Sequence, residues 1–239
     1  MKIRLLETGP HDAFWNMALD EAMMEQAGDV PSLRLYAWSP PAVSIGYFQR
    51  LHEEVDVAKC KELGIDVVRR ITGGGAVFHD AELTYSFITR NYPADIRASY
   101  RLVCDAILKG LASIGIHGQF VPLNDLVLNG RKFSGNAQTR KRGVLLQHGT
   151  ILLKVDVEKM FSLLKVPDEK IRGKLIQNVK ERVTGLNRDF EEVAEALKRG
   201  FAEHFGAQLV PSKPTKEELE RAAELAETKY ATEEWLNRV

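Results

Sequence analysis

Residues 69–80 read RRITGGGAVFHD, and this glycine-rich segment is the strongest indication of where a ligand approaches the 239-residue chain. Because glycine accepts positive φ without steric cost, successive N–H groups of such a segment can converge around an anion. A triple glycine is more often a plain turn, but the two arginines beside it favour an anion site. The apolar runs at 65–68 and 83–88 predict that the loop joins two strands of one sheet.

A second polar cluster lies farther along, in the sequence NDLVLNGRKFSG. Asn129-Gly130 between two apolar runs predicts a hairpin with a type I′ turn, which needs positive φ at both residues. The register then opposes Asp125 to Ser134 and makes Asp125 and Lys132 diagonal neighbours, about 7 Å apart or less. A solvated ion pair, worth under about 1 kcal/mol, is the plain interpretation. The alternative is Mg²⁺ on the carboxylate, with a phosphate or acyl oxygen on the ammonium group.

Taken together, these segments resemble those of the lipoate–protein ligases, within the wider group that also holds biotin ligases and octanoyltransferases. The resemblance rests on RRITGGGAVFHD at 69–80, ND at 124–125, GRKFSGNA at 130–137 and QHGT at 147–150, with weaker similarity in NMALDE at 16–21, IGYFQ at 45–49 and YATEEW at 230–235. It implies an α+β fold with a mixed β-sheet core flanked by helices, like a biotin/lipoate ligase catalytic domain. Residues 1–239 are expected to form that single catalytic domain.

The function that the resemblance implies is ATP-dependent lipoate–protein ligation. Such an enzyme uses ATP and Mg²⁺ to convert lipoic acid to lipoyl-AMP, then passes the lipoyl group to a lysine of a lipoyl carrier domain. The carriers include E2 subunits of 2-oxoacid dehydrogenases and the glycine cleavage H protein. By position, Lys132 is implied as the catalytic residue and Asp125 as the metal ligand. The implied nucleotide- and acyl-binding residues are Arg70, Gly73, Gly74, Gly75, Ala76, Val77, Phe78, His79, Asn124, Lys132, Gly135, Ala137 and His148.

Cysteine content bears on the alternative, an octanoyl or lipoyl transferase that acts on carrier proteins without ATP. The octanoyltransferases related to this family use a thiolate nucleophile. This chain has only Cys60 and Cys104, both in segments that look helical and both far in sequence from the two glycine-rich segments. Some octanoyltransferases carry a cysteine-bearing insertion before the hairpin, and the chain has none before Asn124. We therefore expect buried structural thiols and prefer the ligase.

A binding module without chemistry is a third class, disfavoured because both Lys132 and Asp125 are present. Nucleic-acid binding is disfavoured because 33 basic and 33 acidic residues leave no net charge. The segment 165–188 is locally basic; a solvated surface and a docking face for acidic carrier domains are equally compatible with it.

Hydropathy and the N-terminal sequence predict a cytoplasmic protein that does not enter the membrane. No run approaches the 18 apolar residues of a transmembrane helix, and the N-terminus has no signal-peptide core. Many family members carry a C-terminal accessory domain, whereas this chain stops at Val239. A separate accessory subunit or a compact stand-alone form is expected.

The order of predicted elements is consistent with one mixed sheet followed by a helical segment. Strands and helices alternate to about residue 155, and helices follow. The sequences DFEE from Asp189 and TKEE from Thr215 are typical of capping boxes that begin helices.

Overall fold

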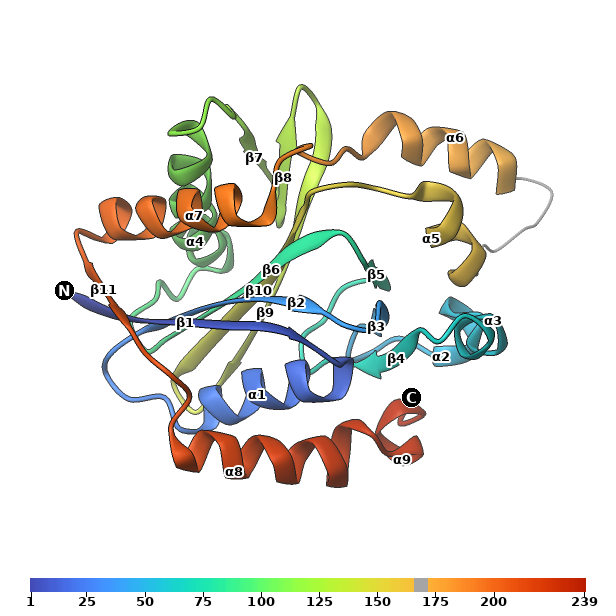
Figure 1. Ribbon diagram of the computed structural model, residues 1–239, viewed down its shortest axis with the longest axis horizontal. Helices are drawn as coiled ribbons and strands as arrows, with labels where there is room; N and C mark the ends of the chain where they lie inside the picture. The colour runs from blue at the N-terminus through green and yellow to red at the C-terminus, as the bar shows by residue number, and fades with distance from the viewer. Residues whose placement is uncertain (166–171) are drawn as a thin grey trace.

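The computed structural model describes residues 1–165 and 172–239, which form an α+β fold with two sheets (Figure 1). The strands are β1 (Lys2–His11), β2 (Ser32–Trp38), β3 (Ala42–Ile45), β4 (Asp66–Arg69), β5 (Val77–His79), β6 (Glu82–Thr89), β7 (Gln119–Val121), β8 (Asp125–Leu128), β9 (Arg131–Lys141), β10 (Val144–Leu152) and β11 (Gln208–Pro211). The larger sheet has the order β11-β1-β2-β6-β10-β9-β8-β7, and the smaller sheet the order β4-β3-β5. Both sheets contain parallel and antiparallel pairs, as the sequence predicts for a mixed sheet.

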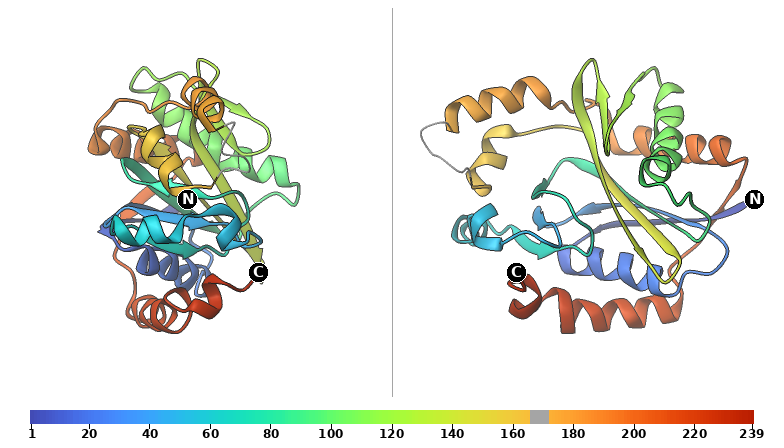
Figure 2. Two further views of the ribbon diagram at one scale, coloured as in Figure 1. Left: turned by 90° about the vertical axis from the view of Figure 1, so that its right-hand side faces the viewer. Right: turned by 180° about the vertical axis from the view of Figure 1, so that it is seen from behind.

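Helices cover both faces of the larger sheet. The helices are α1 (Ala13–Glu25), α2 (Leu51–Glu54), α3 (Val57–Glu62), α4 (Ile96–Ala112), α5 (Val157–Leu163), α6 (Arg172–Arg182), α7 (Phe190–Phe205), α8 (Lys216–Leu225), the π-helix η2 (Ala226–Tyr230) and α9 (Glu233–Leu236). Figures 1 and 2 show α1 and α8 together on one side of the sheet and α4 and α7 together on the other. Among the described residues, no helix has the length and apolar content required to cross a membrane.

Local sequence signals explain where several helices begin and end. The Asp12 carboxylate accepts a hydrogen bond from the Trp15 N–H at 2.8 Å and so caps α1. Thr215 and Glu218 form the predicted capping box of α8, with bonds of 2.7 and 3.1 Å. Asp189 does precede α7, but its side chain makes no capping bond. The predicted start of that helix is confirmed, and the predicted box is not formed.

The central strands are buried on both faces because a layer of helices covers each. All eight residues of β6 are buried, as are eight of the nine in β10. On one face, β6 packs with α4 and α7 around Phe87, Phe133 and Phe201. On the other face, α1 and α8 contribute Met17, Leu19 and Leu225 among others.

Two predictions about where strands lie and how they pair are wrong. The glycine-rich loop joins β4 and β5 of the smaller sheet, whereas the next strand, β6, lies in the larger sheet between β2 and β10. Alternation of apolar residues identifies a strand but not its partner. The sequence pattern therefore predicted a single sheet where the structure has two. The C-terminal part is also not wholly helical, since β11 pairs in parallel with β1.

The predicted hairpin is formed, with a different register. Asn129 and Gly130 have φ values of 51° and 75°, as the type I′ turn requires. Lys132 opposes Val127, but Asp125 opposes Gly135 instead of the predicted Ser134, because the register shifts between Leu126 and Val127. The shift is a β-bulge, which adds one residue to a strand and re-aims its side chains.

Candidate active site

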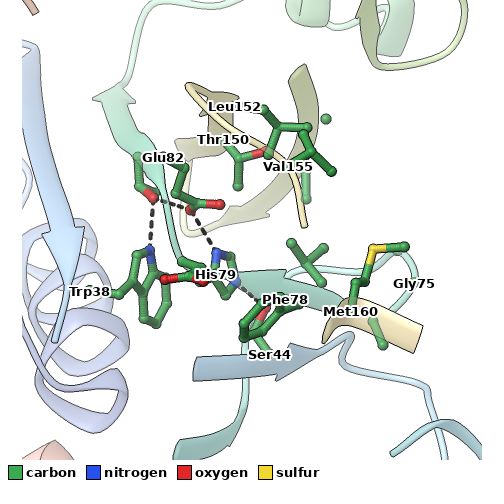
Figure 3. Close-up of a pocket in the computed structure, with 18 of the residues that line it drawn as sticks. Trp38, Ser44, Gly75, Phe78, His79, Glu82, Thr150, Leu152, Val155 and Met160 are labelled. Atoms are coloured by element: carbon green, nitrogen blue, oxygen red, sulfur yellow. Dashed lines mark hydrogen bonds and ion pairs between the residues drawn. The ribbon is translucent and has the colours of Figure 1, made fainter. Parts of the chain in front are cut away.

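A cavity of about 520 Å³ lies where the glycine-rich loop, the β8–β9 hairpin and the end of β10 meet. Residues from both sheets line it (Figure 3). Of the predicted site residues, those that line the cavity are Arg70, Gly74, Gly75, Ala76, Val77, Phe78, His79, Asn124, Lys132, Gly135, Ala137 and His148. Two of the predicted residues do not line it. Gly73 lines a second cavity, and Asp125 forms an ion pair with Lys132. The two glycine-rich segments of the sequence therefore meet around one space.

The two arginines of the glycine-rich segment have different roles. Arg69 is fully buried and donates to the carbonyl oxygens of Gly46, Gln49 and Leu236, so it holds the backbone and the C-terminal segment together. Arg70 lines the cavity instead. The sequence suggests both arginines as anion-binding residues, and only Arg70 is placed to contact an anion in the cavity.

Arg70 is a buried cation with no carboxylate partner among the described residues. Its guanidinium donates to the Gly73 and Gly75 carbonyl oxygens at 2.9 and 2.7 Å, which fixes the path of the loop. It also donates to both oxygens of Ser44, at 3.1 Å each. Burial lowers its pKa to about 10. A buried cation that only neutral oxygens contact is strongly disposed to meet an anionic or polarised oxygen.

Close backbone contact fixes the glycine-rich loop against β3. Gly74 has a φ of +98°, and a Cβ added at Gly46 would lie 2.0 Å from the Gly74 carbonyl oxygen. Only glycine at position 46 lets the loop approach this closely. The loop therefore has little room to shift relative to the strand that carries Ser44.

Lys132 faces the cavity from the hairpin. Its Nζ lies 2.7 Å from Asp125 Oδ1, so the predicted neighbourhood of the two groups is confirmed despite the bulge. A Cβ at Gly135 would lie only 3.0 Å from this Nζ, and the glycine thus leaves room for the lysine side chain. Lys132 is about 40% exposed in the side chain, which makes the pair a weak contributor to stability.

The role of Asp125 as a metal ligand stays a prediction. Oδ1 of its carboxylate pairs with Lys132, and the described part of the chain holds no group of three His, Cys, Asp or Glu side chains that could bind a metal ion. Mg²⁺ is usually held by one or two carboxylates together with phosphate oxygens and water.

His79 belongs to a chain of buried polar groups on the cavity wall. Its Nδ1 lies 2.7 Å from Glu82 Oε1 and its Nε2 lies 2.8 Å from Ser44 Oγ. The Trp38 ring stacks on the imidazole with ring centroids 4.0 Å apart. The second carboxylate oxygen of Glu82 is buried and has no hydrogen-bond partner among the described atoms.

His148 belongs to a second such chain, directed into the core. Its Nε2 lies 2.7 Å from Thr72 Oγ1, and its Nδ1 lies 3.1 Å from Asp20 Oδ2. Burial lowers the pKa of His148, although Asp20 acts in the opposite direction. Burial opposes ionisation of Asp20, but Arg34 at 2.8 Å, His148 and Ser86 outweigh it, so the pKa of this carboxyl lies below its ordinary value.

Neither thiol of the chain lines the cavity. Cys60 is packed among apolar side chains beside the smaller sheet and Cys104 among those between the larger sheet and α4. Burial raises the pKa of Cys60 to about 11 and that of Cys104 to about 12. The prediction of buried thiols is confirmed, and neither is placed to act as a nucleophile.

Much of the cavity lining is apolar, and the sequence did not indicate most of these residues. Several of its residues come from β10, α5, α6 and the segments beside them: Leu152, Val155, Met160, Leu164, Val179 and Val183. Sequence reasoning also missed Trp38, Ser44 and Glu82. Glu82 lies three residues after the motif histidine, so its place in the sequence could have indicated that it is near the site. No such indication exists for Ser44, because only the pairing of β3 with β5 brings it to His79.

The fold has close counterparts among known proteins. The family model described as the lipoyl protein ligase A/B catalytic domain matches residues 12–204. The chain belongs to this family. The family resemblance predicted from the sequence is therefore confirmed, together with the α+β fold of a lipoate ligase catalytic domain.

Curated relatives of this family are similar to the chain over nearly its whole length. The octanoyltransferase LipM of Kyrpidia tusciae is 41% identical and covers 97% of this chain and 97% of that protein. The octanoyltransferase LipM of Anoxybacillus flavithermus is 38% identical and covers 97% and 96%.

Solved structures of the family include ligases. A chain from a bipartite lipoate protein ligase and E2 lipoyl domain system of Thermoplasma acidophilum superimposes with a TM-score of 0.94, at 36% identity over 100% of this chain and 98% of that one. A lipoate-protein ligase A bound with ATP gives a TM-score of 0.88 at 32% identity, over 99% and 98%.

These relatives correct the functional prediction. The expectation of an ATP-dependent lipoate–protein ligase is wrong, because curated relatives at 34–41% identity over almost the full chain are named octanoyltransferases. There is a physical reason why the motifs do not distinguish ligation from transfer. A cationic loop and a lysine stabilise an acyl carbonyl oxygen whether the leaving group is a nucleotide or a thiol. The absence of an accessible cysteine excluded one nucleophile and did not establish ATP chemistry.

Proposed function

We propose that this chain transfers an octanoyl or lipoyl group to a lysine of a lipoyl carrier domain, without ATP. The observation that carries the proposal is a single cavity lined both by the cationic side chains of Arg70 and Lys132 and by apolar side chains from β10, α5 and α6. The curated octanoyltransferases among its relatives support the same reaction class. Residues 1–239 act in this proposal as one catalytic domain, since both sheets contribute to the cavity.

The apolar part of the cavity is suited to the acyl chain. Leu152, Val155 and Met160 lie there, and each methylene buried against such side chains contributes about 0.8 kcal/mol to binding. An acid of medium length therefore gains several kcal/mol before any polar contact is made.

The cationic side chains of the cavity are suited to the reacting carbonyl. When an amine replaces a thiol at a thioester, negative charge develops on the carbonyl oxygen in the transition state. Arg70, which has no carboxylate partner among the described residues, and Lys132 are cations of the two glycine-rich segments that line the cavity. We assign the acyl carbonyl to them and the wall of the acyl site to the loop from Gly74 to His79. Asn124, Gly135, Ala137 and His148 complete the proposed site.

The acceptor is proposed to be a lipoyl carrier domain. A family relative from Thermoplasma acidophilum is described together with an E2 lipoyl domain. The basic stretch at 165–188 is a candidate docking face, although residues 166–171 lie outside the part that the structure describes. The predicted cytoplasmic location, the H protein as an acceptor and the separate accessory subunit stay predictions.

A reconstituted transfer assay tests the proposal. Purified chain is incubated with an octanoyl thioester of acyl carrier protein and a recombinant E2 lipoyl domain, with and without ATP and Mg²⁺. We expect intact-mass measurement to find octanoylated lipoyl domain at equal rates in both mixtures. Free octanoate or lipoate with ATP serves as the comparison. Modification only from the free acid and only with ATP would contradict the proposed transfer.

A further inference from the structure

Ser44, His79 and Glu82 form a continuous hydrogen-bonded chain on the cavity wall (Figure 3). They come from three different strands or their ends: β3, β5 and β6. Ser44 Oγ lies 2.8 Å from His79 Nε2, and His79 Nδ1 lies 2.7 Å from Glu82 Oε1. All three line the cavity. A hydroxyl, an imidazole and a carboxylate in this order are the components of an activated serine nucleophile.

The surrounding donors fix the direction of the protons. Trp38 Nε1–H donates to Thr84 Oγ1 at 2.8 Å, and the Thr84 hydroxyl donates to Glu82 Oε1 at 2.6 Å. A carboxylate in the ionised form can only accept, and with Glu82 in that form His79 Nδ1 carries the proton between them. The Nε2 lone pair is then free to accept the hydroxyl proton of Ser44. This is the tautomer that a general base requires.

Charge around the chain also suits a nucleophile. Arg70 Nη1 donates to Ser44 Oγ at 3.1 Å, and a donor there would also lie beside a carbonyl attacked by that oxygen. Apart from His79, no cationic side chain among the described residues pairs with Glu82. Its negative charge is therefore left to stabilise the imidazolium that forms when His79 takes a proton.

The rest of the chain offers no thiolate for this role, since both thiols lie outside the cavity with raised pKa values. Ser44 is about 1% exposed, so a covalent ester on it would be shielded from bulk water. Exclusion of water favours transfer over hydrolysis.

Resting on the proposed acyl transfer, we propose that Ser44 is the nucleophile that carries the acyl group, with His79 as its general base and Glu82 as the residue that positions His79. In the first step, Ser44 Oγ bonds to the thioester carbonyl carbon and the C–S bond breaks. The Ser44 proton passes to His79 Nε2 and from there to the departing sulfur, which leaves as a thiol.

In the second step, the neutral amine of the carrier lysine attacks the Ser44 ester. The C–N bond forms, the C–O bond to Ser44 breaks, and an amine proton returns through His79 Nε2 to Ser44 Oγ. The net products are an amide and a thiol, and no oxidant, reductant or nucleotide is consumed.

The first experiment traps the ester on the unaltered protein. The chain is mixed with octanoyl acyl carrier protein without an acceptor, denatured in acid within seconds, and analysed by intact mass and peptide mapping. We expect one octanoyl group, mapped to Ser44, which disappears on addition of lipoyl domain. Transfer to the lipoyl domain with no octanoyl group on Ser44 at any time would overturn the inference while leaving the proposed function intact. No transfer from the thioester at all would overturn the proposed function itself.

Variants separate a chemical role from a structural one. Ser44→Ala and His79→Gln are expected to lower the transfer rate by at least about 100-fold, the usual contribution of a positioned base. Ser99→Ala is the matched control, because it removes a buried hydroxyl from a side chain that does not line the cavity. It should retain the ester at Ser44 and most of the transfer rate.

Ser44→Cys provides the positive test. It should carry the octanoyl group as a thioester that neutral hydroxylamine cleaves, and iodoacetamide should stop its activity but not that of the unaltered protein. Transfer by Ser44→Ala at the unaltered rate would exclude the serine.

Discussion

The chain contains two buried hydroxyl–imidazole–carboxylate arrangements that differ in what surrounds the carboxylate. In the core arrangement, Thr72, His148 and Asp20 are linked at 2.7 and 3.1 Å. In the cavity arrangement, Ser44, His79 and Glu82 are linked at 2.8 and 2.7 Å. The geometry of the two is nearly the same.

The Asp20 and Glu82 carboxylates differ in how fully neighbouring groups neutralise their negative charge. Both oxygens of Asp20 accept hydrogen bonds, with Arg34 and Ser86 on one and Tyr36 and His148 on the other. Glu82 has no arginine or lysine partner within the described residues, and one of its oxygens accepts no bond. A fully satisfied buried network stabilises a fold, whereas an unsatisfied polar group persists where it serves another purpose. The comparison assigns stability to the first arrangement and chemistry to the second.

Arg34→Met tests the first half of this comparison and should have the largest effect. Arg34 is fully buried at 2.8 Å from Asp20, and its removal leaves a buried charge without its cation. We expect the free energy of unfolding to fall by about 3–5 kcal/mol. Urea denaturation measures this. Arg221→Met is the matched control, since the half-exposed pair with Glu25 should contribute at most about 1 kcal/mol. Equal losses in the two variants would contradict the assignment.

Lys132→Met tests the cationic side chains of the cavity and should have the next largest effect, this time on the transfer rate. Losing one donor to a developing oxyanion costs about 2.7–4 kcal/mol, so octanoyl transfer should slow by about 100- to 1,000-fold. The free energy of unfolding should change by less than about 1 kcal/mol, because the Asp125 pair is partly exposed. Lys109→Met removes a surface lysine of similar exposure and should leave the rate unchanged. Near-normal transfer by Lys132→Met would remove this lysine from the mechanism.

The pH dependence of stability distinguishes the core arrangement further. Burial lowers the pKa of His148 in the folded protein. Below pH 6.5 the imidazole of the unfolded chain takes up a proton, whereas the folded imidazole stays neutral to lower pH. The unfolded state then binds more protons, and the free energy of unfolding falls as pH decreases, by at most about 1.4 kcal/mol per pH unit. Asp20 does not contribute in this window, because its lowered pKa keeps it ionised in both states.

Urea denaturation at pH 7.5 and 5.5 measures this change. His148→Gln should be less stable at pH 7.5 but should lose less stability between the two pH values. An equal pH response of the variant would show that other groups govern acid sensitivity.

Thiol modification should have the smallest effect. Since the pKa values of Cys60 and Cys104 are raised to about 11 and 12, both stay protonated as well as buried at pH 8.5. Iodoacetamide should leave the mass of the folded protein and its transfer rate unchanged within twofold, and should label both thiols after unfolding in urea. Rapid loss of transfer with labelling of Cys104 would point to a thiolate mechanism and against Ser44.

Local features of this protein follow from its sequence alone. The Asn129-Gly130 turn, the nearness of Lys132 to Asp125 and the Thr215 capping box each depend on backbone sterics over a few residues. The motif residues that line the cavity are likewise grouped in short stretches, and the family resemblance of those stretches named nearly all of them.

Only the tertiary structure decided the rest. The bulge that moves Gly135 opposite Asp125, the pairing of β11 with β1 and the division into two sheets depend on which strands pair, and apolar alternation is the same for every partner. Ser44 reaches His79 across 35 positions of sequence through the pairing of β3 with β5. Long-range pairing is selected by the packing of the whole core, so no short stretch of sequence encodes it.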